Sequence, residues 1–337
     1  MTDSLLMSSG KPRIFSGMQP SGVLHIGNYL GALRNWAKIQ YDFEPIFCVV
    51  DQHAITVYQD PKALRESIEQ VAALYLAAGI DPDHSAVFVQ SQVPGHVELG
   101  WIFTCVTPMG WLGRMTQFKA KSGNQETVGT GLFCYPALMA ADILLYQAKI
   151  VPVGEDQAQH LELTRNIAER FNHLYGDTFV VPETRLPAVG ARVMGLDDPT
   201  QKMSKSAEGA NHAISMLEEP GRIKKLIGRA VTDSNPQVEW ETAGPGVRNL
   251  LGIFQAFSEQ SNAEMRAEFD GMRYGDLKKR VTEMVVESLS PIQAKYRELM
   301  NNRDHLRHIL QRSAERITPI AEQTVQLAKE RTGLFSG

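Results

Sequence analysis

The sequence is poor in cysteine, has no long uninterrupted apolar run and carries little net charge. Its three cysteines, Cys48, Cys105 and Cys134, are far apart and form no Cys-x-x-Cys pair. Neither a zinc knuckle nor a secreted disulfide framework is therefore indicated, and we expect buried, reduced side chains. No stretch approaches the length needed to span a bilayer, and residues 1–10 show no basic segment leading into an apolar core. We expect a soluble, cytoplasmic protein with no membrane partner.

The charge balance gives no global sign of a nucleic-acid partner. The 337 residues carry a formal net charge of -4, and 43% of them are hydrophobic. A chain of this size can form one large domain or, as we expect here, a larger and a smaller domain that share an interface. Any contact with RNA must then come from a local basic patch.

The first half alternates short apolar runs with longer helical patterns, which predicts a parallel sheet wrapped by helices. One helix start is well marked, because Asp60 can cap it and Pro61 suits its first turn, and Gly79 ends the pattern. The successive segments are 13–16, 26–39, 46–50, 62–78 and 86–90. The predicted fold class is α/β, with a Rossmann-like nucleotide-binding domain.

The second half is predicted to be helical, since it shows no convincing strand pattern. Pro199 and several Ser and Gly residues dilute the apolar pattern in 190–207, and we place a domain boundary there. The predicted domains are residues 1–196 and a smaller, all-helical domain of residues 197–304. After the boundary, helical segments are expected at 214–217, 223–230, 250–257, 277–288, 291–300 and 317–329.

A glycine-bearing loop joins the first predicted strand to the first helix. It covers residues 16–22 and leads to a His-Ile-Gly-Asn motif at 25–28. Such a loop presents backbone N–H groups and the positive helix end to an anion. His25 and Asn28 would offer donors one turn apart, and Gly27 would leave a face open to a flat group. ATP fits such a place, although a helix-capping loop with a surface histidine explains these residues equally well.

A second motif, Lys-Met-Ser-Lys-Ser at 202–206, lies in the region of the predicted boundary. Two lysines three residues apart, between small hydroxyl residues, can bring positive charge onto a triphosphate and follow it to the leaving pyrophosphate. Alone, this pentamer is as often a solvated charged loop. Together, the two motifs resemble the paired signatures of the class I aminoacyl-tRNA synthetases, with Asn28 in place of the second histidine of the common form.

A carboxylate inside an apolar helical pattern indicates which amino acid would be activated. Tyr135, Met139, Asp142 and Tyr146 fall at helical spacings and share one face. A buried carboxylate needs a donor, and the indole N–H is a donor with no acceptor function, so Asp142 could select tryptophan by its one polar atom. Alternatively, Asp142 pairs locally with Lys149 or a backbone amide.

Apolar residues on neighbouring segments could line a slot for an indole, with few polar groups. Taken singly, each of them is more often plain core. They are Phe15, His53, Met139, Val151 and Val153.

Longer runs make the resemblance specific to one family, the bacterial tryptophanyl-tRNA synthetases. The match covers roughly residues 13–235 and weakens after about residue 240. The runs are Phe-Ser-Gly-Met-Gln-Pro-Ser-Gly from Phe15, Asp-Gln-His-Ala-Ile-Thr from Asp51, Arg-Met-Thr-Gln-Phe-Lys from Arg114, Tyr-Pro-x-Leu-Met-Ala-Ala-Asp-Ile-Leu-Leu-Tyr from Tyr135, and Val-Pro-Val-Gly-Glu-Asp-Gln from Val151.

This resemblance implies ATP-dependent activation of L-tryptophan to tryptophanyl-AMP with release of pyrophosphate, followed by transfer to tRNA(Trp). It implies that Asp142 accepts the indole N–H, and that Tyr135 and Gln157 meet the substrate ammonium. Gln19 would contact the carboxylate end, and Asp156 would position groups near the second motif. The slot would be lined by Phe15, His53, Met139, Val151 and Val153.

For ATP, the resemblance implies catalytic roles for His25, Asn28, Lys121, Lys202 and Lys205, with the three lysines on the triphosphate. Mg²⁺ would be held chiefly by ATP oxygens, without a metal site made by the protein alone. The residues expected to contact ATP are Gln19, Ser21, Gly27, Asn28, Asp156, Lys202, Met203, Ser204, Lys205 and Ser206.

For RNA, Arg222, Lys225 and Arg229 repeat at helical spacing opposite an apolar stripe. They form either a phosphate-binding face or an ordinary solvated helix face. The resemblance implies that the helical domain reads the anticodon and that the protein is a symmetric homodimer. It also implies a last helix, at about 305–337, that packs back onto the nucleotide-binding domain.

Three other functions compete with this prediction. A tyrosyl-tRNA synthetase shares the architecture and an Asp-based selector, although the Gly-Glu-Asp-Gln run from Gly154 favours tryptophan. A nucleotidyltransferase of the same superfamily would leave the helix from Tyr135 and the helical domain without a purpose. A non-catalytic RNA-binding paralogue would have no reason to keep His25, Lys202 and Lys205.

Overall fold

A parallel sheet lies at the centre of the computed structural model, which describes residues 10–22, 24–116, 128–152, 157–185, 192–204 and 211–335. Its strands are β1 (Arg13–Met18), β2 (Glu44–Val49), β3 (Ala86–Val89), β4 (Ile150–Pro152) and β5 (Glu183–Arg185). They lie in the order β3-β2-β1-β4-β5, and every neighbouring pair is parallel. The predicted α/β fold with a Rossmann-like parallel sheet is confirmed.

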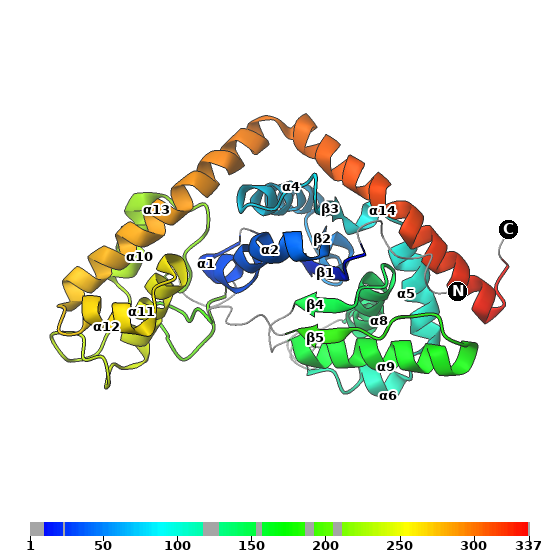
Figure 1. The fold of residues 1–337 in the computed structure, drawn as a ribbon, viewed down its shortest axis with the longest axis horizontal. Helices are drawn as coiled ribbons and strands as arrows, with labels where there is room; N and C mark the ends of the chain where they lie inside the picture. Colours follow the sequence, from blue (N-terminus) through cyan, green and yellow to red (C-terminus); the bar gives the residue numbers. More distant parts are fainter. Residues whose placement is uncertain are drawn as a thin grey trace.

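Helices cover both faces of this sheet, and a further group of helices lies beyond its edge (Figure 1). Up to residue 175 they are α1 (Ile26–Asn28), η2 (Tyr29–Leu33), α2 (Arg34–Ile39), η3 (Gln40–Asp42), α3 (Asp51–Ala54), α4 (Pro61–Ala77), η4 (Gln90–Gln92), α5 (Gly95–Val106), α6 (Met109–Leu112), α8 (Thr130–Leu144) and α9 (Ala158–Tyr175). After residue 211 they are α10 (Pro220–Gly228), α11 (Pro245–Ser258), α12 (Asn262–Phe269), α13 (Tyr274–Asn301) and α14 (Arg303–Thr332).

Alternate side chains of the central strands enter two separate cores, one on each face of the sheet. Phe47 and Val49 of β2 belong to one core, whereas Ile46 and Cys48 belong to the other. The first core continues from the sheet into α10, α11 and α13, and the second is closed by α5, α8, α9 and α14. Because β2 is buried on both faces, its sequence is a continuous apolar run rather than an alternating one.

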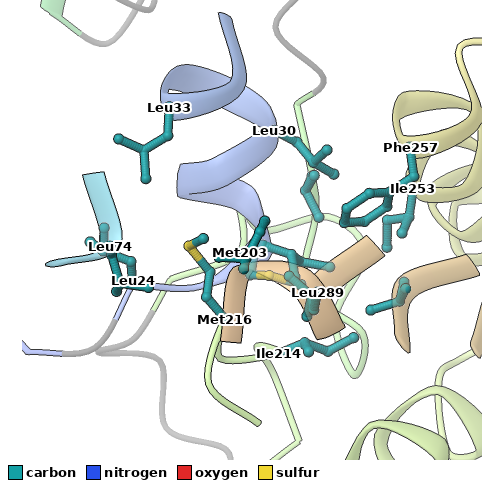
Figure 2. Close-up of a cluster of buried hydrophobic side chains, with 14 of the residues drawn as sticks. Leu24, Leu30, Leu33, Leu74, Met203, Ile214, Met216, Ile253, Phe257 and Leu289 are labelled. Carbon is teal, nitrogen blue, oxygen red and sulfur yellow. The ribbon is translucent and has the colours of Figure 1, made fainter. Parts of the chain in front are cut away.

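The second motif is anchored in the first core by Met203, whose side chain is buried. Figure 2 shows Met203 among Leu30 of η2, Phe257 of α11 and Leu289 of α13. One set of buried contacts therefore joins the helical run after β1, the second motif and the helices beyond residue 211.

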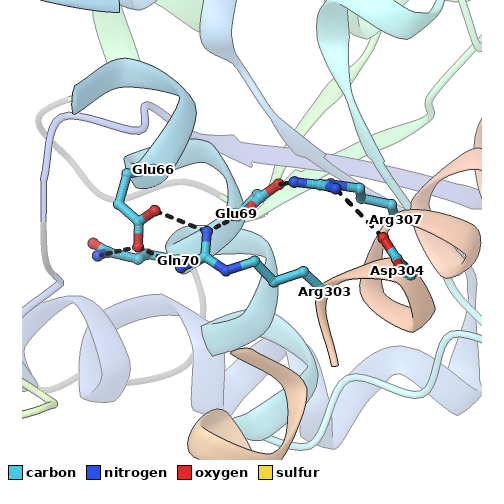
Figure 3. Close-up of polar contacts among 6 residues, drawn as sticks. All are labelled: Glu66, Glu69, Gln70, Arg303, Asp304 and Arg307. Atoms are coloured by element: carbon cyan, nitrogen blue, oxygen red, sulfur yellow. Dashed lines mark hydrogen bonds and ion pairs between the residues drawn. The ribbon is translucent and has the colours of Figure 1, made fainter. Parts of the chain in front are cut away.

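The two longest helices, α13 and α14, form a bent arch over the rest of the chain (Figure 1). Figure 3 shows how the bend is held against α4: Arg303 Nη1 lies 2.8 Å from Glu66 Oε2 and also bonds Glu69. Arg307 adds a second bond to Glu69, at 2.7 Å. Exposed ion pairs contribute little to stability, so this network fixes the position of the bend more than it stabilises the fold.

After the bend, α14 packs against β3 and α5, along the outer edge of the sheet (Figure 1). Arg312 Nη2 lies 2.6 Å from Asp83 Oδ1, and Arg316 Nη1 donates to the Asp83 carbonyl at 3.1 Å, just before β3. An uncovered edge strand would expose unpaired backbone groups that invite association. The last helix therefore covers the β3 edge of the sheet.

The elements predicted in the first half are confirmed at close to their expected bounds. Asp60 caps α4 by accepting a hydrogen bond from Ala63 N at 2.9 Å, and Pro61 takes the first helical position. The short strand β5 was not predicted, because its three residues, Glu183–Arg185, carry no apolar alternation.

Two predictions in the second half are wrong. Residues 214–217 are not helical, because their backbone pairs with the segment before α1. Ile26 N donates to Ile214 O at 2.9 Å, and Met216 N donates to Leu24 O at 2.8 Å. The two segments predicted at 277–288 and 291–300 are one helix, α13, which continues through Pro291.

The cysteine prediction is confirmed only in part. The expectation of buried cysteines holds for Cys48, but Cys105 is exposed and Cys134 is partly exposed. Within the described ranges, no helix is both long and apolar enough to cross a membrane.

Candidate active site

The strand order changes direction between β1 and β4. The chain moves from β1 to β2 on one side, whereas β4 lies on the other side of β1. The connections that leave the carboxyl ends of β1 and β4 therefore diverge, and open α/β sheets bind their ligands at such a switch point. The loop after β1, α3 after β2 and η4 after β3 all start from the same edge of the sheet.

The first motif opens the helical run that follows β1. His25 N donates to Asn28 Oδ1 at 3.0 Å, and Asn28 N donates to His25 O at 2.9 Å. Asn28 thus closes the first turn with its oxygen and keeps its amide group as a donor. A Cβ on Gly27 would lie 2.9 Å from the His25 imidazole. The His25 ring therefore lies against Gly27, and a side chain at this position would displace it.

The His25 imidazole is held neutral by its surroundings. Burial lowers its pKa most, the nearby charges of Lys202 and His212 lower it further, and the pKa is about 4. At neutral pH the ring has one donor and one acceptor nitrogen. His25 can therefore donate to a phosphate oxygen without adding a positive charge to the site.

The second motif begins on one arm of a narrow hairpin that covers residues 193–203. Met203 N donates to Val193 O at 3.0 Å, and Gly195 N donates to Gln201 O at 2.8 Å. Lys202 is exposed, whereas Met203, the next residue, is buried in the core shown in Figure 2. Any contact of Met203 with a nucleotide would therefore come from its backbone.

Several expected ATP contacts can be placed only in part. Gln19 is half-buried directly after β1, Ser21 is exposed in the same loop, and Ser204 is half-buried. Lys121, Asp156, Lys205 and Ser206 lie outside the described residues.

The carboxylate of Asp142, in α8, is almost completely buried and meets side chains from three other elements. His53 Nε2, in α3, lies 2.7 Å from Oδ2. Gln90 Nε2, in η4, donates to Oδ1 at 2.6 Å, and His96 Nδ1, in α5, lies 2.6 Å from the same oxygen. The alternative pairing with Lys149 is not formed, since Lys149 Nζ lies 3.8 Å from Glu183 Oε1.

These donors keep Asp142 ionised. Burial, the largest cause, raises the pKa of the carboxyl, but the charges and hydrogen bonds of His53 and His96 together lower it to about 2. A carboxylate has about four lone-pair sites. Among the described residues Oδ1 accepts two bonds and Oδ2 one. One direction on Oδ2 therefore remains for a further donor.

Two tyrosines hold the histidines of this pocket in place. Tyr146 Oη lies 2.8 Å from His96 Nε2, so the His96 ring is held between this hydroxyl and the Asp142 carboxylate. Tyr135 Oη lies 2.7 Å from His160 Nε2, and burial raises the pKa of Tyr135 to about 12. Both hydroxyls therefore stay protonated at neutral pH, since burial also raises the pKa of Tyr146.

Of the predicted slot residues, His53 contacts this carboxylate, and Phe15, Val151 and Met139 belong to the hydrophobic core on one face of the sheet. Phe15 is buried and stacks on Tyr146, with ring centroids 5.9 Å apart. The His53 ring meets the Tyr135 ring edge-on at 6.0 Å. Val151 is buried in β4, Met139 is half-buried in α8, and Gln157 is half-buried at the start of α9, while Val153 lies outside the described residues.

Gln90 and His96 were not predicted as site residues. Gln90 ends the third apolar run, at the same edge of the sheet where His53 follows the second, and this placement is a signal that the sequence carries. His96 has no such signal, because it meets Asp142 only through the packing of α5 on α8.

The basic stripe on α10 has the predicted two faces. Lys225 and Arg229 are exposed and Arg222 is partly exposed, while the stripe of Ile223, Leu226, Ile227 and Ala230 is buried. Within the part of the chain that the structure describes, no group of three His, Cys, Asp or Glu side chains is arranged to hold a metal ion.

Comparison with known proteins gives a family match over most of the chain. The model of the class I tRNA synthetases (W and Y) matches residues 7–290. A tryptophan–tRNA ligase of Wolinella succinogenes is 51% identical over 326 residues, which cover 96% of this chain and 99% of the relative. One from Helicobacter pylori is 50% identical, with coverage of 96% and 99%.

Solved structures agree in fold. The tryptophanyl-tRNA synthetase of Mycoplasma pneumoniae is 35% identical with a TM-score of 0.88, and the alignment covers 97% of this chain and 99% of that one. The Campylobacter jejuni enzyme, complexed with ADP and tryptophan, is 36% identical with a TM-score of 0.83 and coverage of 96% and 100%. A tyrosyl-tRNA synthetase of Archaeoglobus fulgidus, 20% identical with a TM-score of 0.68, covering 86% of this chain and 91% of its own, shares the fold alone.

Acid should destabilise the protein through His25. The pKa of its imidazole is lowered from 6.5 to about 4, so the unfolded chain takes up a proton at a higher pH than the folded chain does. The stabilising effect is complete above about pH 6.5 and is lost as the pH falls to about 4. His25→Gln cannot titrate, so its free energy of unfolding in urea should fall less over this range, by up to about 3 kcal/mol.

A matched control is His173→Gln, which changes an exposed histidine of α9. It should keep the pH dependence of the unchanged protein. An equal loss of stability in His25→Gln and in the unchanged protein would show that His25 is not held neutral.

Proposed function

The chain belongs to the class I tRNA synthetases of the tryptophan and tyrosine type, and we infer from its nearly full-length match to tryptophan–tRNA ligases that it joins L-tryptophan to tRNA(Trp) with the use of ATP. The structural observation that most supports this function is the buried, ionised carboxylate of Asp142. Its Oδ2 has one lone-pair site that no described residue fills. Relatives that act on tyrosine support the fold alone, since they are about 20% identical.

The reaction is a two-step transfer that needs positioning and charge more than a protein nucleophile. The tryptophan carboxylate attacks the α-phosphate of ATP in line, which forms tryptophanyl-AMP and releases pyrophosphate. The terminal ribose of the tRNA then takes the acyl group and AMP leaves. Holding the two substrates in line lowers the barrier of the first step, and cations stabilise the charge that moves onto pyrophosphate.

Selection of tryptophan over tyrosine follows from the N–H groups that already point at the Asp142 carboxylate. His53 and His96 point a ring N–H, and Gln90 its amide N–H, at the carboxylate. An indole N–H can take the open direction on Oδ2 and has no lone pair left to satisfy. A tyrosine hydroxyl could also donate there, but its own lone pairs would face no donor among these groups. A buried polar group without a partner costs about 1–3 kcal/mol.

The remaining contacts of tryptophan follow the arrangement around Asp142. Phe15, Met139 and Val151 line the apolar sides of the indole slot, together with His53 and Val153. Tyr135 and Gln157 bind the ammonium group, and Gln19, directly after β1, contacts the carboxylate end. The support is that Tyr135 and Asp142 are on one helix and that Phe15 and Val151 are on the two strands that border the switch point.

At the ATP end, His25 and Asn28 contact adenosine and phosphates, and Lys121, Lys202 and Lys205 neutralise the triphosphate. The neutral state of His25 supports its role as a hydrogen-bond donor. The further contacts are Gln19, Ser21, Gly27, Asp156, Met203, Ser204 and Ser206. Mg²⁺ is held mainly by ATP oxygens, as is usual for this ion in nucleotide sites.

Residues 197–304 form the anticodon-binding domain, and residues 1–196 with the last helix form the catalytic domain. The exposed Lys225 and Arg229 of α10 support a face that meets tRNA phosphates. The packing of α14 on β3 and α5 supports the assignment of the last helix.

A second copy of the chain covers an apolar stripe on α5, so that the enzyme acts as a homodimer. Val97, Trp101 and Cys105 recur every four residues on one exposed face of α5, and Met109 extends this stripe onto α6. Exposed apolar stripes of this kind mark interfaces. The exposed, unpaired Cys105 also suits a reducing compartment, which supports the cytoplasm as the site of action.

Exchange of pyrophosphate into ATP should depend on tryptophan alone among the twenty amino acids. The hydrogen bond to Asp142 can be tested separately from the shape of the slot with 3-benzothienylalanine, which resembles tryptophan but has no N–H. The unchanged enzyme should prefer tryptophan over this analogue by kcat/KM at least about tenfold. Asp142→Asn should reduce this ratio toward one. Exchange with tyrosine, or a ratio that stays the same in the variant, would contradict the assignment.

Lys202→Ala and Lys205→Ala should lower the rate of tryptophan activation about 100-fold while the KM for tryptophan changes little. The reason is that these charges act on the leaving pyrophosphate and not on the indole slot. Pre-steady-state formation of tryptophanyl-AMP measures the rate. Lys62→Ala, at an exposed lysine of α4, is the matched control. Equal losses of rate and tryptophan affinity would rule out the assigned role.

Trp101→Arg should convert the dimer to a monomer, because it places a charge on the apolar stripe of α5. Light scattering coupled to size exclusion gives the mass. Phe335→Arg, at an exposed residue near the end of the chain, should leave the dimer intact. A dimer that persists in Trp101→Arg would place the interface elsewhere.

A further inference from the structure

A buried histidine closes the hairpin that carries Lys202. His212 is 4% exposed, and its two ring nitrogens have different partners. Nδ1 lies 2.6 Å from Asp197 Oδ1, at the turn of the hairpin. Nε2 lies 3.2 Å from the backbone oxygen of Lys202, on the second arm.

Neither of these partners has a hydrogen to give. A carbonyl oxygen and a carboxylate oxygen only accept, whereas a neutral imidazole has a single N–H. Both bonds can form together only if the pair of His212 and Asp197 holds one proton more than a neutral ring beside an ionised carboxylate. The imidazolium, with an N–H on each nitrogen, meets this requirement directly.

The ring of His212 fits closely inside the hairpin. A Cβ on Gly195 would lie 2.1 Å from His212 Cε1 and 2.5 Å from Nδ1, so a side chain at residue 195 would displace the ring. Leu196 N also donates to the His212 carbonyl at 3.0 Å. On the outer side, Asn249 of α11 bonds both the N–H and the carbonyl of Met194. The first arm is therefore fixed to α11, while His212 ties the second arm to the turn.

The same segment also contacts the first motif. Ile214 O accepts from Ile26 N at 2.9 Å, and Met216 N donates to Leu24 O at 2.8 Å. Met203, Ile214 and Met216 lie in one buried cluster (Figure 2). Residues 212–216 therefore hold Lys202 on one side and the residues around His25 on the other.

We propose that His212, held by Asp197, is a positioning residue that in its doubly protonated form fixes the backbone of Lys202 relative to His25 for the activation step. This inference rests on the proposed function of Lys202. Without its bond to His212, the Lys202 carbonyl is no longer tied to the turn, and the backbone bonds of Gln201 O and Met203 N to the first arm are left to hold the Lys202 backbone in place.

The charges that face His212 come from every side of the hairpin. Asp197 and Asp198 lie at the turn, and Lys202 lies on the second arm. His25 lies close enough for the charge of His212 to lower the His25 pKa. The neutral state of His25 keeps a further positive charge away from the ring.

Asp197→Asn tests whether the two bonds of His212 need the extra proton. An asparagine amide N–H can donate to a neutral Nδ1, which leaves Nε2–H for the Lys202 carbonyl, so the geometry no longer needs the extra proton. With each profile normalised to its own maximum, kcat for tryptophan-dependent pyrophosphate exchange should depend less steeply on pH in Asp197→Asn than in the unchanged enzyme.

His212→Gln removes one of the two bonds at every pH. Its kcat for exchange should fall about tenfold and its KM for ATP should rise, while its KM for tryptophan stays the same, because the Asp142 pocket is not involved. His173→Gln is the matched control on the exposed face of α9. A pH dependence in Asp197→Asn as steep as that of the unchanged enzyme, or an unchanged kcat in His212→Gln, would overturn the proposal.

A second measurement does not depend on activity or on the stability of the variants. Nitrogen-15 NMR of histidine-labelled, unmodified protein at near-neutral pH should show one buried ring with a proton on both nitrogens. A neutral ring at His212, assigned by the signal that His212→Gln lacks, would overturn the proposal even in an active enzyme. If the unchanged protein has no tryptophan-dependent exchange, the proposed function fails, and the NMR result still decides the state of His212.

Discussion

The ionised carboxylate of Asp142 places the strongest constraint on this fold. An unpaired charge in the interior would be expensive, so the structure must bring donors to it. They come from α3, η4 and α5, while the carboxylate itself is on α8. Three of these four elements must therefore meet the fourth within hydrogen-bond distance, which fixes the packing of α5 on α8 and the positions of the segments that follow β2 and β3. The pocket is preorganised because His53, Gln90 and His96 already contact the carboxylate from fixed elements.

The other end of the site is organised in the opposite way. Here the fixed groups are backbone contacts and a shared core, and the charges lie on side chains at the surface. Met203 anchors its hairpin among Leu30, Phe257 and Leu289, while Lys202 remains exposed beside it. An exposed lysine on an anchored backbone can follow charge as it moves during the reaction, because only its side chain has to rearrange. In the proposed function, tryptophan would thus meet a preorganised, buried pocket, and ATP would meet more adaptable cations.

The sequence predicts β1, β2, β3 and the helices between them, which carry local signals such as the apolar run of β2 or the cap of α4, but it does not predict the short strands β4 and β5. It also points to Asp142 and to both motifs, because a buried acid on a helix and two short basic or histidine motifs are visible without coordinates. His96 and His212 are not visible in this way. Each meets its partner only after helices or loops distant in sequence have packed, and neither has a periodic or motif signal. The error at 214–217 has the same origin: the apolar spacing suits a helix, but tertiary pairing with Leu24 and Ile26 decides the backbone.

The charge states at the two ends of the proposed site have different causes. At the proposed tryptophan end an anion is surrounded by donors, so the carboxyl pKa of Asp142 falls to about 2 despite burial. At the proposed ATP end, burial and the charges of Lys202 and His212 lower the pKa of His25 to about 4. If His25 were charged, it would repel the lysine that has to approach the same phosphates. A neutral His25 leaves the charge of the triphosphate to groups that can move with it, and it still supplies a fixed hydrogen bond. The burial of His25 against Gly27 therefore serves the chemistry as well as the packing of the first helical turn.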